Sequence, residues 1–429
     1  MKIYKRFIVG LIVVLIGLGA YYGYTSFIEQ KTEYKTPEES DIYVRFDMEV
    51  YDKIREIYWA DTTDEQLSDL FKNSLDKITG TANDLISKDR SGTAKMISSA
   101  YSQATSTEAK KTTSLDLAMV VLYNLLPIGR NGILSDEQET AFRQNVSNMD
   151  PSKNLYLDLG LEKGANIEEI NLAYNKKADE LKKSTSAEAK EELEKITYSH
   201  FVLSDRDSKD LYDQAQIEPT LFSKIVGQTL YVDLSKISPT TLIEFVRAVD
   251  NASTTKNIDT MIIDFRNNVG GSLDFLVNFF GLFVGKNQYV FDFFQKGDYL
   301  PQRSVQPKYP ELERFKEIAI LTDSMTQSTA ELTTATFKKF RLARVVGTVT
   351  RGWGTVENTY PLETEINPGV KYSLLLVNSL TLRDDGEPIE GNGIIPDIDI
   401  TKSGWQNELT EYFKSKSLIE AIKKEIVIE

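Results

Sequence analysis

The chain of 429 residues is long enough for two or three domains, and its 41% of apolar residues indicates packed cores. A net charge of −14 excludes the basic surface that a nucleic-acid partner would need. The chain has no cysteine and one histidine, His200, which excludes disulfides, thiolate zinc sites, a cysteine nucleophile and polyhistidine metal sites. We therefore expect no metal and no cofactor.

The amino terminus predicts a membrane anchor. Residues 7–27 carry no charged side chain and are numerous enough to span a bilayer as a helix. Lys2, Lys5 and Arg6 precede this run and Glu29 follows it, which places the start of the chain in the cytoplasm. The sequence thus predicts a cytoplasmic start and transmembrane helix over residues 1–30, and a single-pass membrane protein whose bulk is extracytoplasmic. A cleaved signal peptide is the alternative, although no clear small-x-small cleavage site follows the run.

A helical lead-in region is expected over residues 41–150. After a short polar tether, apolar side chains recur at helical spacing between residues 43 and 78, for example at Val50, Ile54 and Ile57. Residues 136–148 are rich in Gln, Glu and Asn, which is typical of a solvated helix.

Residues 151–215 form a further helical pattern. Residues 154–161 read NLYLDLGL, Asn166 is an acceptable N-cap for a helix from residue 167, a second helix follows from about residue 187, and residues 211–214 read LYDQ. This pattern resembles a J domain over its whole length. The His-Pro-Asp triplet of J domains is absent, however, and the loop at 181–186 reads LKKSTS. The resemblance therefore implies a degenerate J-like domain without co-chaperone activity. His200 in its second helix is read as a packed or solvated helix residue, and a role as a base for a distant serine is the disfavoured alternative.

The carboxyl-terminal half predicts an α/β unit over residues 220–402, followed by a helix over 403–429. Apolar runs predict strands at 229–234, 258–265, 318–322 and 344–347, and amphipathic segments between them predict helices at 240–249, 272–283 and 331–340. The fold class is therefore multi-domain, α plus α/β.

Two motifs in this half could carry chemistry. One strand leads into the pair Gly270 and Gly271 at a helix start, where backbone N–H groups can approach a developing negative charge. The alternative for this pair is a plain strand-to-helix turn. Ser328 begins the segment STAE after an apolar strand, a position that suits a nucleophile. It is equally the N-cap of a capping box with Glu331, and the two descriptions are compatible.

Four ordered segments carry a resemblance to a known family. Residues 262–271 read IIDFRNNVGG, residues 322–331 read TDSMTQSTAE, residues 343–357 read ARVVGTVTRGWGTVE, and residues 389–398 read IEGNGIIPDI. They resemble the carboxyl-terminal processing peptidases, or tail-specific serine proteases, over about residues 41–80 and 220–400. The peptide-binding PDZ module of that family is not recognisable, and the J-like unit occupies its place.

The resemblance implies roles for individual residues. It makes Ser328 the nucleophile and the backbone N–H groups of Gly270 or Gly271 and of Thr329 the oxyanion hole. The family's catalytic lysine falls on Trp353, and the glutamine that orients this lysine falls on Glu357.

The substitution at Trp353 removes the expected base, because an indole offers only an N–H donor. Glu357 could replace that base if burial raised its pKa. Lys338 and Lys339 lie about three helical turns from Ser328 and are too distant, and the position of Lys371 cannot be assessed from the sequence. Trp353 itself could pack on the turn made by its flanking glycines or line a peptide groove.

Three functions follow as hypotheses. The first is a membrane-anchored serine peptidase that cleaves envelope or secreted proteins near unstructured carboxyl-terminal tails, with protein or peptide substrates and the membrane as its partners. The second is a pseudoprotease that binds peptides or acts as a scaffold because the lysine position holds Trp353. A membrane-tethered co-chaperone is disfavoured by the missing triplet.

Overall fold

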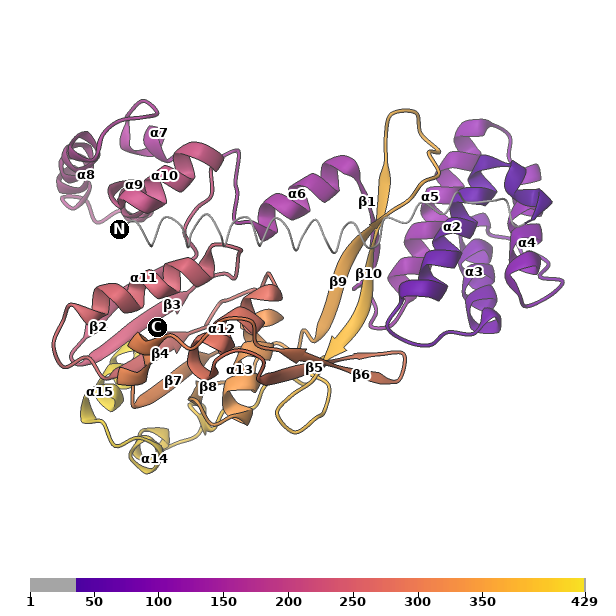
Figure 1. Ribbon diagram of the computed structural model, residues 1–429. Coiled ribbons are helices and arrows are strands. Elements are labelled where there is room, and N and C mark those ends of the chain that lie inside the picture. The colour runs from indigo at the N-terminus through magenta and orange to yellow at the C-terminus, as the bar shows by residue number, and fades with distance from the viewer. Residues whose placement is uncertain (1–35, 428–429) are drawn as a thin grey trace. The chain divides into compact units, whose positions relative to one another are not determined.

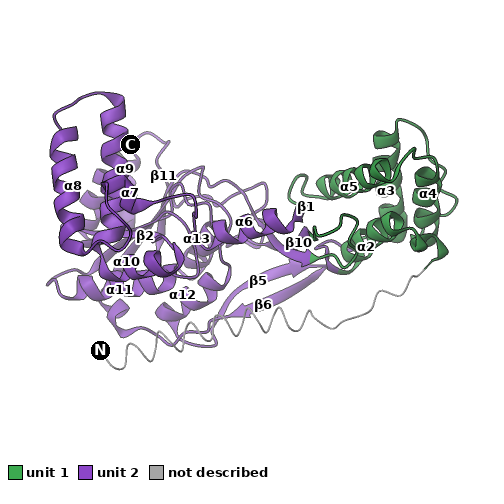
Figure 2. Ribbon diagram, turned by 90° about the horizontal axis from the view of Figure 1, so that it is seen from above, with its two compact units in different colours: residues 1–56, 62–133, 361–372 green, residues 57–61, 134–360, 373–429 purple. Residues whose placement is uncertain are grey.

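The computed structural model describes residues 36–427, which divide into two compact units (Figures 1 and 2). The first unit contains residues 36–56, 62–133 and 361–372. The second contains residues 57–61, 134–360 and 373–427. Residues 361–372, which we expected within the protease-like domain, therefore group with the helical lead-in region.

The first unit is built from helices. They are η1 (Pro37–Ser40), α2 (Ile42–Ile57), α3 (Asp64–Thr79), α4 (Arg90–Ser102) and α5 (Thr107–Asn124). Helix α3 begins where the Thr63 hydroxyl accepts the backbone N–H of Gln66, and it ends at Gly80 with a left-handed φ of 71°. The buried Glu49 of α2 accepts the backbone N–H groups of Glu363 and Thr364, at 2.6 and 3.0 Å, and so holds the segment 361–372.

The predicted membrane anchor must be corrected. In the part of the chain that the structure describes, no helix is both long enough and apolar enough to cross a membrane. The transmembrane helix in the expected fold class and the single-pass membrane localisation are therefore not supported. Residues 1–30, on which that prediction was based, lie outside the described residues.

Four helices follow the linking elements β1 (Gly132–Ser135) and α6 (Asp136–Val146). They are α7 (Leu155–Leu159), α8 (Ile167–Leu181), α9 (Ala187–Ser204) and α10 (Arg206–Ala215). The predicted N-cap is confirmed, because the Asn166 side chain accepts the N–H of Glu169 and the Glu169 side chain accepts that of Asn166. The helices share a small core that includes Leu155, Tyr156, Ile170 and Ile196. The likeness to a J domain stays a prediction.

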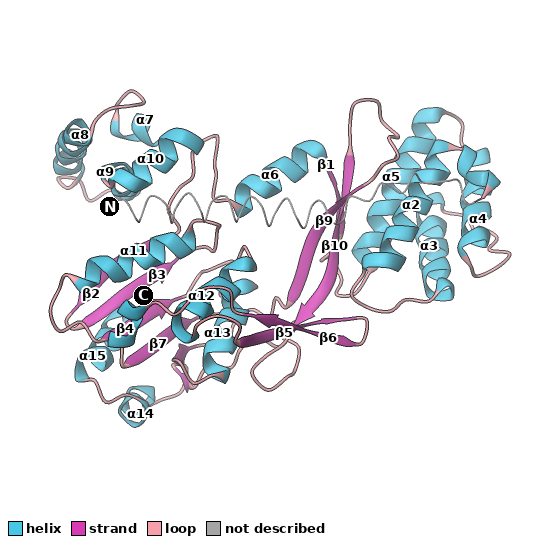
Figure 3. Cartoon of the chain, viewed as in Figure 1, coloured by secondary structure: helices cyan, strands magenta, loops and turns pink. Residues whose placement is uncertain are grey.

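A six-stranded sheet forms the centre of the second unit (Figure 3). Its order is β11-β8-β7-β4-β3-β2, and all neighbours are parallel except β2 and β3. The strands are β2 (Leu221–Val226), β3 (Thr229–Leu234), β4 (Thr260–Asp264), β7 (Glu317–Thr322), β8 (Arg344–Gly347) and β11 (Ile398–Asp399). The four strands that the sequence predicted are β3, β4, β7 and β8, and all four are confirmed.

Helices cover both faces of this sheet. The core on one face includes side chains from α11 (Thr241–Ser253), α12 (Asp274–Val284) and α13 (Thr329–Lys339), among them Phe245, Phe279 and Phe337. The core on the other face contains side chains from α14 (Trp405–Tyr412) and α15 (Lys416–Val427). The segment after residue 403 thus carries two helices, where the sequence suggested one.

A second, antiparallel sheet was not predicted. Its order is β1-β10-β5-β6, and β9 also pairs with β10. Its strands after β1 are β5 (Tyr289–Gln295), β6 (Asp298–Arg303), β9 (Thr355–Pro361) and β10 (Tyr372–Thr381), and a short helix η2 (Pro310–Arg314) leads from β6 to β7. Strand β9 begins two residues after Trp353 and carries Glu357.

Candidate active site

Ser328 lies at the N-cap of α13, six residues beyond the end of the parallel strand β7. Its backbone has φ of 58° and ψ of −127°, an uncommon conformation for a residue with a side chain. The preceding turn is fixed by Thr326, whose hydroxyl donates to the Phe265 carbonyl at 2.7 Å, and by the Gln327 N–H, which donates to the Asn268 carbonyl at 2.9 Å. Ser328 is half-buried. Strain at a supported, partly accessible serine is typical of a functional position.

The glycine turn lies directly against this serine. Gly270 has φ of +83°, and a Cβ placed on it would lie 2.6 Å from the Ser328 Cβ. At Gly271 a Cβ would lie 1.7 Å from the carbonyl oxygen of Ile237. The Thr329 hydroxyl donates to the Gly271 carbonyl at 2.9 Å, which ties the turn to the first residue of α13. Only glycine permits this approach of the two segments.

The three expected oxyanion donors are not equivalent. The N–H of Gly270 donates to the side-chain oxygen of the buried Asn268 at 2.7 Å, and the Asn268 amide in turn donates to the Leu234 carbonyl. The N–H groups of Gly271 and Thr329 donate no hydrogen bond within residues 36–427. Gly271 and Thr329 are therefore the candidates left free to bind an oxyanion. Nothing in the sequence indicated that the third expected donor, the Gly270 N–H, binds the Asn268 side chain.

At the position expected to hold the base, the Trp353 side chain hydrogen-bonds to the carboxylate of Glu357. The Trp353 indole N–H donates to Oε1 of Glu357 at 3.0 Å, and the Thr355 hydroxyl donates to the same oxygen at 2.5 Å. Within the described residues, no carboxylate, amine or imidazole hydrogen-bonds to the Ser328 hydroxyl. The structure thus joins Glu357 to Trp353 and not to the serine. Glu357 orients the side chain at position 353, as the resemblance implies for the family's glutamine.

Three other titratable side chains that the sequence suggested, His200, Lys338 and Lys339, have partners elsewhere. The His200 ring stacks on Tyr174 with centroids 4.1 Å apart, and its Nε2 lies 2.7 Å from the Asn171 side-chain oxygen. Lys338 donates to the Ile395 carbonyl at 2.7 Å, and the Lys339 ammonium lies 5.2 Å from the centre of the Tyr289 ring. Burial lowers the pKa of His200, which fits a packed residue of the helical unit.

Glu331 binds the serine segment to the turn that carries Trp353. Its Oε2 accepts the N–H groups of Ser328 and Trp353 at 2.9 and 2.8 Å. Its Oε1 accepts the N–H of Gly352 at 2.7 Å and the hydroxyl of Thr350 at 2.5 Å. The capping-box pattern predicted only the contact with Ser328, because the other partners lie 19 to 22 residues away in the sequence.

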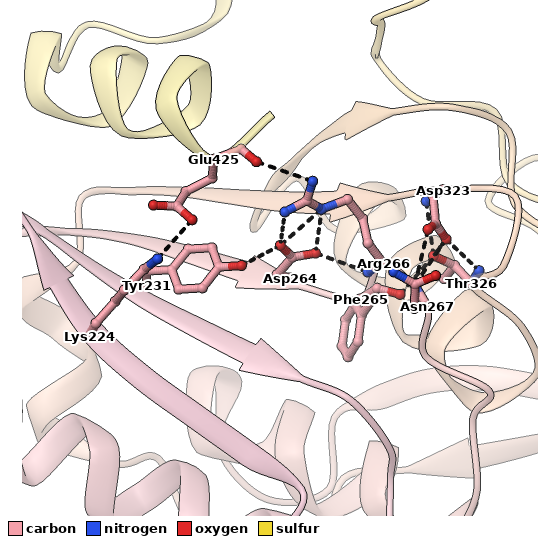
Figure 4. A network of polar contacts seen from close by, with 9 residues as sticks. All are labelled: Lys224, Tyr231, Asp264, Phe265, Arg266, Asn267, Asp323, Thr326 and Glu425. Atoms are coloured by element: carbon pink, nitrogen blue, oxygen red, sulfur yellow. Dashed lines mark hydrogen bonds and ion pairs between the residues drawn. The ribbon is translucent and has the colours of Figure 1, made fainter. Parts of the chain in front are cut away.

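A polar network at the carboxyl end of β4 supports the same loops (Figure 4). The Arg266 guanidinium donates to both oxygens of Asp264, and the Tyr231 hydroxyl donates to Asp264 at 2.6 Å. Arg266 also reaches the backbone carbonyl of Glu425 in α15, at 3.3 Å. The next residue, Asn267, donates its N–H to Asp323 in the turn before Ser328, at 3.1 Å. Figure 4 shows how this chain of contacts runs from α15 past β4 to that turn.

A strained serine at a helix start, a glycine turn packed against it and free N–H donors beside it form the arrangement that we expect of a serine-type peptidase site. Residues 228–400 match the model of Peptidase family S41. The predicted resemblance to the carboxyl-terminal processing peptidases is thereby confirmed over residues 228–400.

Curated relatives agree with this class. The "Probable CtpA-like serine protease" of Staphylococcus epidermidis is 27% identical over 205 residues, which cover 47% of this chain and 40% of that protein. The protein of the same name from Staphylococcus aureus strain N315 is 32% identical over 150 residues, which cover 34% of this chain and 28% of that protein. The matches thus span less than half of the length of these relatives.

Two solved structures are also similar. A lipoprotein from Streptococcus agalactiae is 13% identical, with a TM-score of 0.44 over 89% of this chain and 98% of that chain. The photosystem II D1 C-terminal processing protease is 11% identical, with a TM-score of 0.47 over 83% of this chain and 93% of that chain.

Proposed function

We propose that this protein is a peptidase of the carboxyl-terminal processing type that cleaves unstructured protein tails, with Ser328 as its nucleophile. One observation carries the proposal. The strained Ser328 lies against the Gly270 turn, with the N–H groups of Gly271 and Thr329 free beside it. Such donors act on the charge that develops in the transition state, which is where electrostatic stabilisation accelerates acyl transfer most.

The reaction begins with attack of the Ser328 oxygen on the scissile carbonyl carbon. A bond forms between these atoms, and the carbonyl oxygen takes up negative charge that the N–H groups of Gly271 and Thr329 stabilise. The C–N bond then breaks, the amine leaves with a proton from water, and a second water hydrolyses the acyl-serine. Because no side-chain base hydrogen-bonds to Ser328 in the described residues, its proton passes to water. Loss of one catalytic partner typically leaves a rate about 10³ to 10⁴ above the reaction in water, so we expect slow turnover.

A second function rests on the same site. The indole of Trp353 and the carboxylate of Glu357 satisfy each other, so this side of the site is complete without a proton acceptor for Ser328. A protein with this arrangement could keep a peptide groove and perform no chemistry. We therefore keep a peptide-binding pseudoprotease as the alternative.

One experiment separates the two functions. The full-length wild type and Ser328→Ala are each incubated with an unstructured protein and with peptides that end in apolar residues. Cleavage by the wild type that disappears in Ser328→Ala supports the peptidase and ends the alternative. Trp353→Lys and Glu357→Gln complete the set. If neither the wild type nor Glu357→Gln exceeds buffer while Trp353→Lys cleaves, the wild-type protein is a pseudoprotease, and the peptidase proposal fails.

A further inference from the structure

We infer that Glu331 is a positioning residue, whose carboxylate sets the backbone at position 353 against the backbone of Ser328. This inference rests on the proposed function for its meaning in catalysis, but the geometry it describes does not depend on turnover. Glu331 is fully buried at the first turn of α13. Its four hydrogen-bond donors come from two segments, with Ser328 on one and Thr350, Gly352 and Trp353 on the other.

The four hydrogen bonds occupy both oxygens of the Glu331 carboxylate, with two donors on each oxygen. An ionised carboxylate accepts at two oxygens, whereas the amide of glutamine has one acceptor oxygen and an NH₂ group that would meet N–H donors. Three of the four donors are main-chain N–H groups, which have no freedom to turn away. A buried N–H group without an acceptor costs about 1–3 kcal/mol. Glutamine at this position would therefore leave part of this set of donors without an acceptor.

Glu331 has no compensating cation. In the part of the chain that the structure describes, it forms no ion pair, and burial raises the pKa of its carboxyl while the four hydrogen bonds oppose that rise. Burying an unpaired carboxylate is costly unless hydrogen bonds satisfy it. A helix cap alone would not require a buried carboxylate, because a serine or threonine N-cap also stabilises a helix when the glutamate or glutamine three residues later is exposed to solvent. The burial therefore points to a task beyond capping the helix.

This role is to fix the position of the turn that contains Gly352 and Trp353 relative to the backbone of Ser328, which we call the register of the two segments. The donors on the turn belong to the main chain of Gly352 and Trp353, so Glu331 holds position 353 whatever side chain it carries. Thr350 extends the junction, because its hydroxyl donates to Glu331 and also accepts the N–H of Ile394 at 2.7 Å. Displacements of about 1 Å at a reacting group can cost on the order of 10²-fold in rate, so the register matters for any chemistry at Ser328.

The test compares Glu331→Gln with Glu244→Gln in the full chain. Glu244 is a matched control, because it also lies in a first helical turn and accepts two backbone N–H groups, those of Thr220 and Leu221, at 2.7 and 3.0 Å. Amide hydrogen exchange of residues 349–355 reports the register, and the rate at which a fluorophosphonate labels Ser328 reports its presentation. In Glu331→Gln we expect exchange to rise about 10-fold or more and labelling to fall about 10- to 100-fold. Glu244→Gln should change neither.

Thr350→Val and Thr350→Ser keep the test decisive if Glu331→Gln does not fold. Thr350→Val removes the hydroxyl with little change of shape and should raise exchange of residues 349–355, whereas Thr350→Ser should restore the wild-type rate. Unchanged exchange in Glu331→Gln, or an equal change in Glu244→Gln, would overturn the assignment of Glu331. Absence of labelling in the wild type argues against the proposed function alone, because the exchange measurement still decides the role of Glu331.

Discussion

The backbone N–H groups of Ser328 and Trp353 donate to the same oxygen atom, Oε2 of Glu331, at 2.9 and 2.8 Å. Twenty-five positions apart in the sequence, the two residues are thus joined through one acceptor. The main chain at position 353 is therefore fixed relative to the serine, and the departures from what the family resemblance implies are in the side chains of Trp353 and Glu357. A site of this kind can be altered by changing one side chain while its backbone stays in place.

Trp353→Lys should raise the rate of peptide cleavage above that of the wild type, by about 10²-fold or more if the amine reaches Ser328. The neighbouring carboxylate of Glu357 should limit the gain, because a nearby negative charge stabilises the ammonium form and raises the pKa of a lysine. Adding Glu357→Gln to Trp353→Lys should therefore increase kcat/KM at pH 7 further and move the rising limb of its pH profile to lower pH. A double variant no faster than Trp353→Lys would contradict this account of Glu357. Ser328→Ala in the same background is the control for background cleavage.

Gly270→Ala should abolish labelling of Ser328 by a fluorophosphonate. The new Cβ would lie 2.6 Å from the Ser328 Cβ and 2.9 Å from the Gln327 carbonyl oxygen, so the glycine turn or the serine must move. Gly297→Ala is a matched control, because Gly297 has a similar φ of +87° and no atom within 4 Å of the added Cβ. Both variants should lose roughly 1 kcal/mol or more of stability from backbone strain, measured by thermal unfolding. Equal labelling of the two variants would show that crowding at Gly270 is unimportant.

The sequence predicted those features of the fold that depend on residues close together in the chain. Strands β4 and β7 are continuous apolar runs buried in a parallel sheet, and such runs are visible in the sequence. The cap at Asn166 was visible for the same reason, because its partner lies three residues away. The antiparallel sheet was missed, because the paired residues of β5 and β10 lie 86 and 88 positions apart and most side chains of β5 are only partly buried.

The candidate site likewise has features that short sequence segments predicted and features that they did not. The motifs indicated Ser328, the glycine pair and the substitution at Trp353, because each lies within a short recognisable segment. The closing of Glu357 onto the Trp353 indole and the occupation of the Gly270 N–H by Asn268 depend on side-chain directions that no spacing reveals. The role of Glu331 depends on contacts 21 and 22 residues apart and could not be read from its capping box.

Glu49→Ala should release residues 361–372 from the helices of the first unit. The substitution leaves the N–H groups of Glu363 and Thr364 without their acceptor, which we expect to cost roughly 1–3 kcal/mol in the free energy of unfolding. Amide exchange at these two residues should become about 10-fold faster. Glu65→Ala is the control, because Glu65 forms an exposed ion pair with Lys88 and such pairs contribute little. Unchanged exchange at residues 363 and 364 would contradict the role of Glu49.

Asp233→Asn should change the pH dependence of stability. Burial and the charge of the neighbouring Asp264 raise the pKa of Asp233 to about 6, while Arg266 and Lys224 oppose that rise and Glu425 adds to it. The folded protein therefore holds a proton on Asp233 that the unfolded chain releases, and the free energy of unfolding falls as pH rises from about 4 to about 6. The asparagine variant lacks this fall and should be more stable than the wild type at pH 7 by roughly 1–3 kcal/mol. Calorimetric midpoints from pH 4 to 7 measure the difference, with Asp298→Asn on the exposed part of β6 as the control. Parallel curves for the wild type and Asp233→Asn across this range would refute the prediction, because a titrating Asp233 must make them diverge.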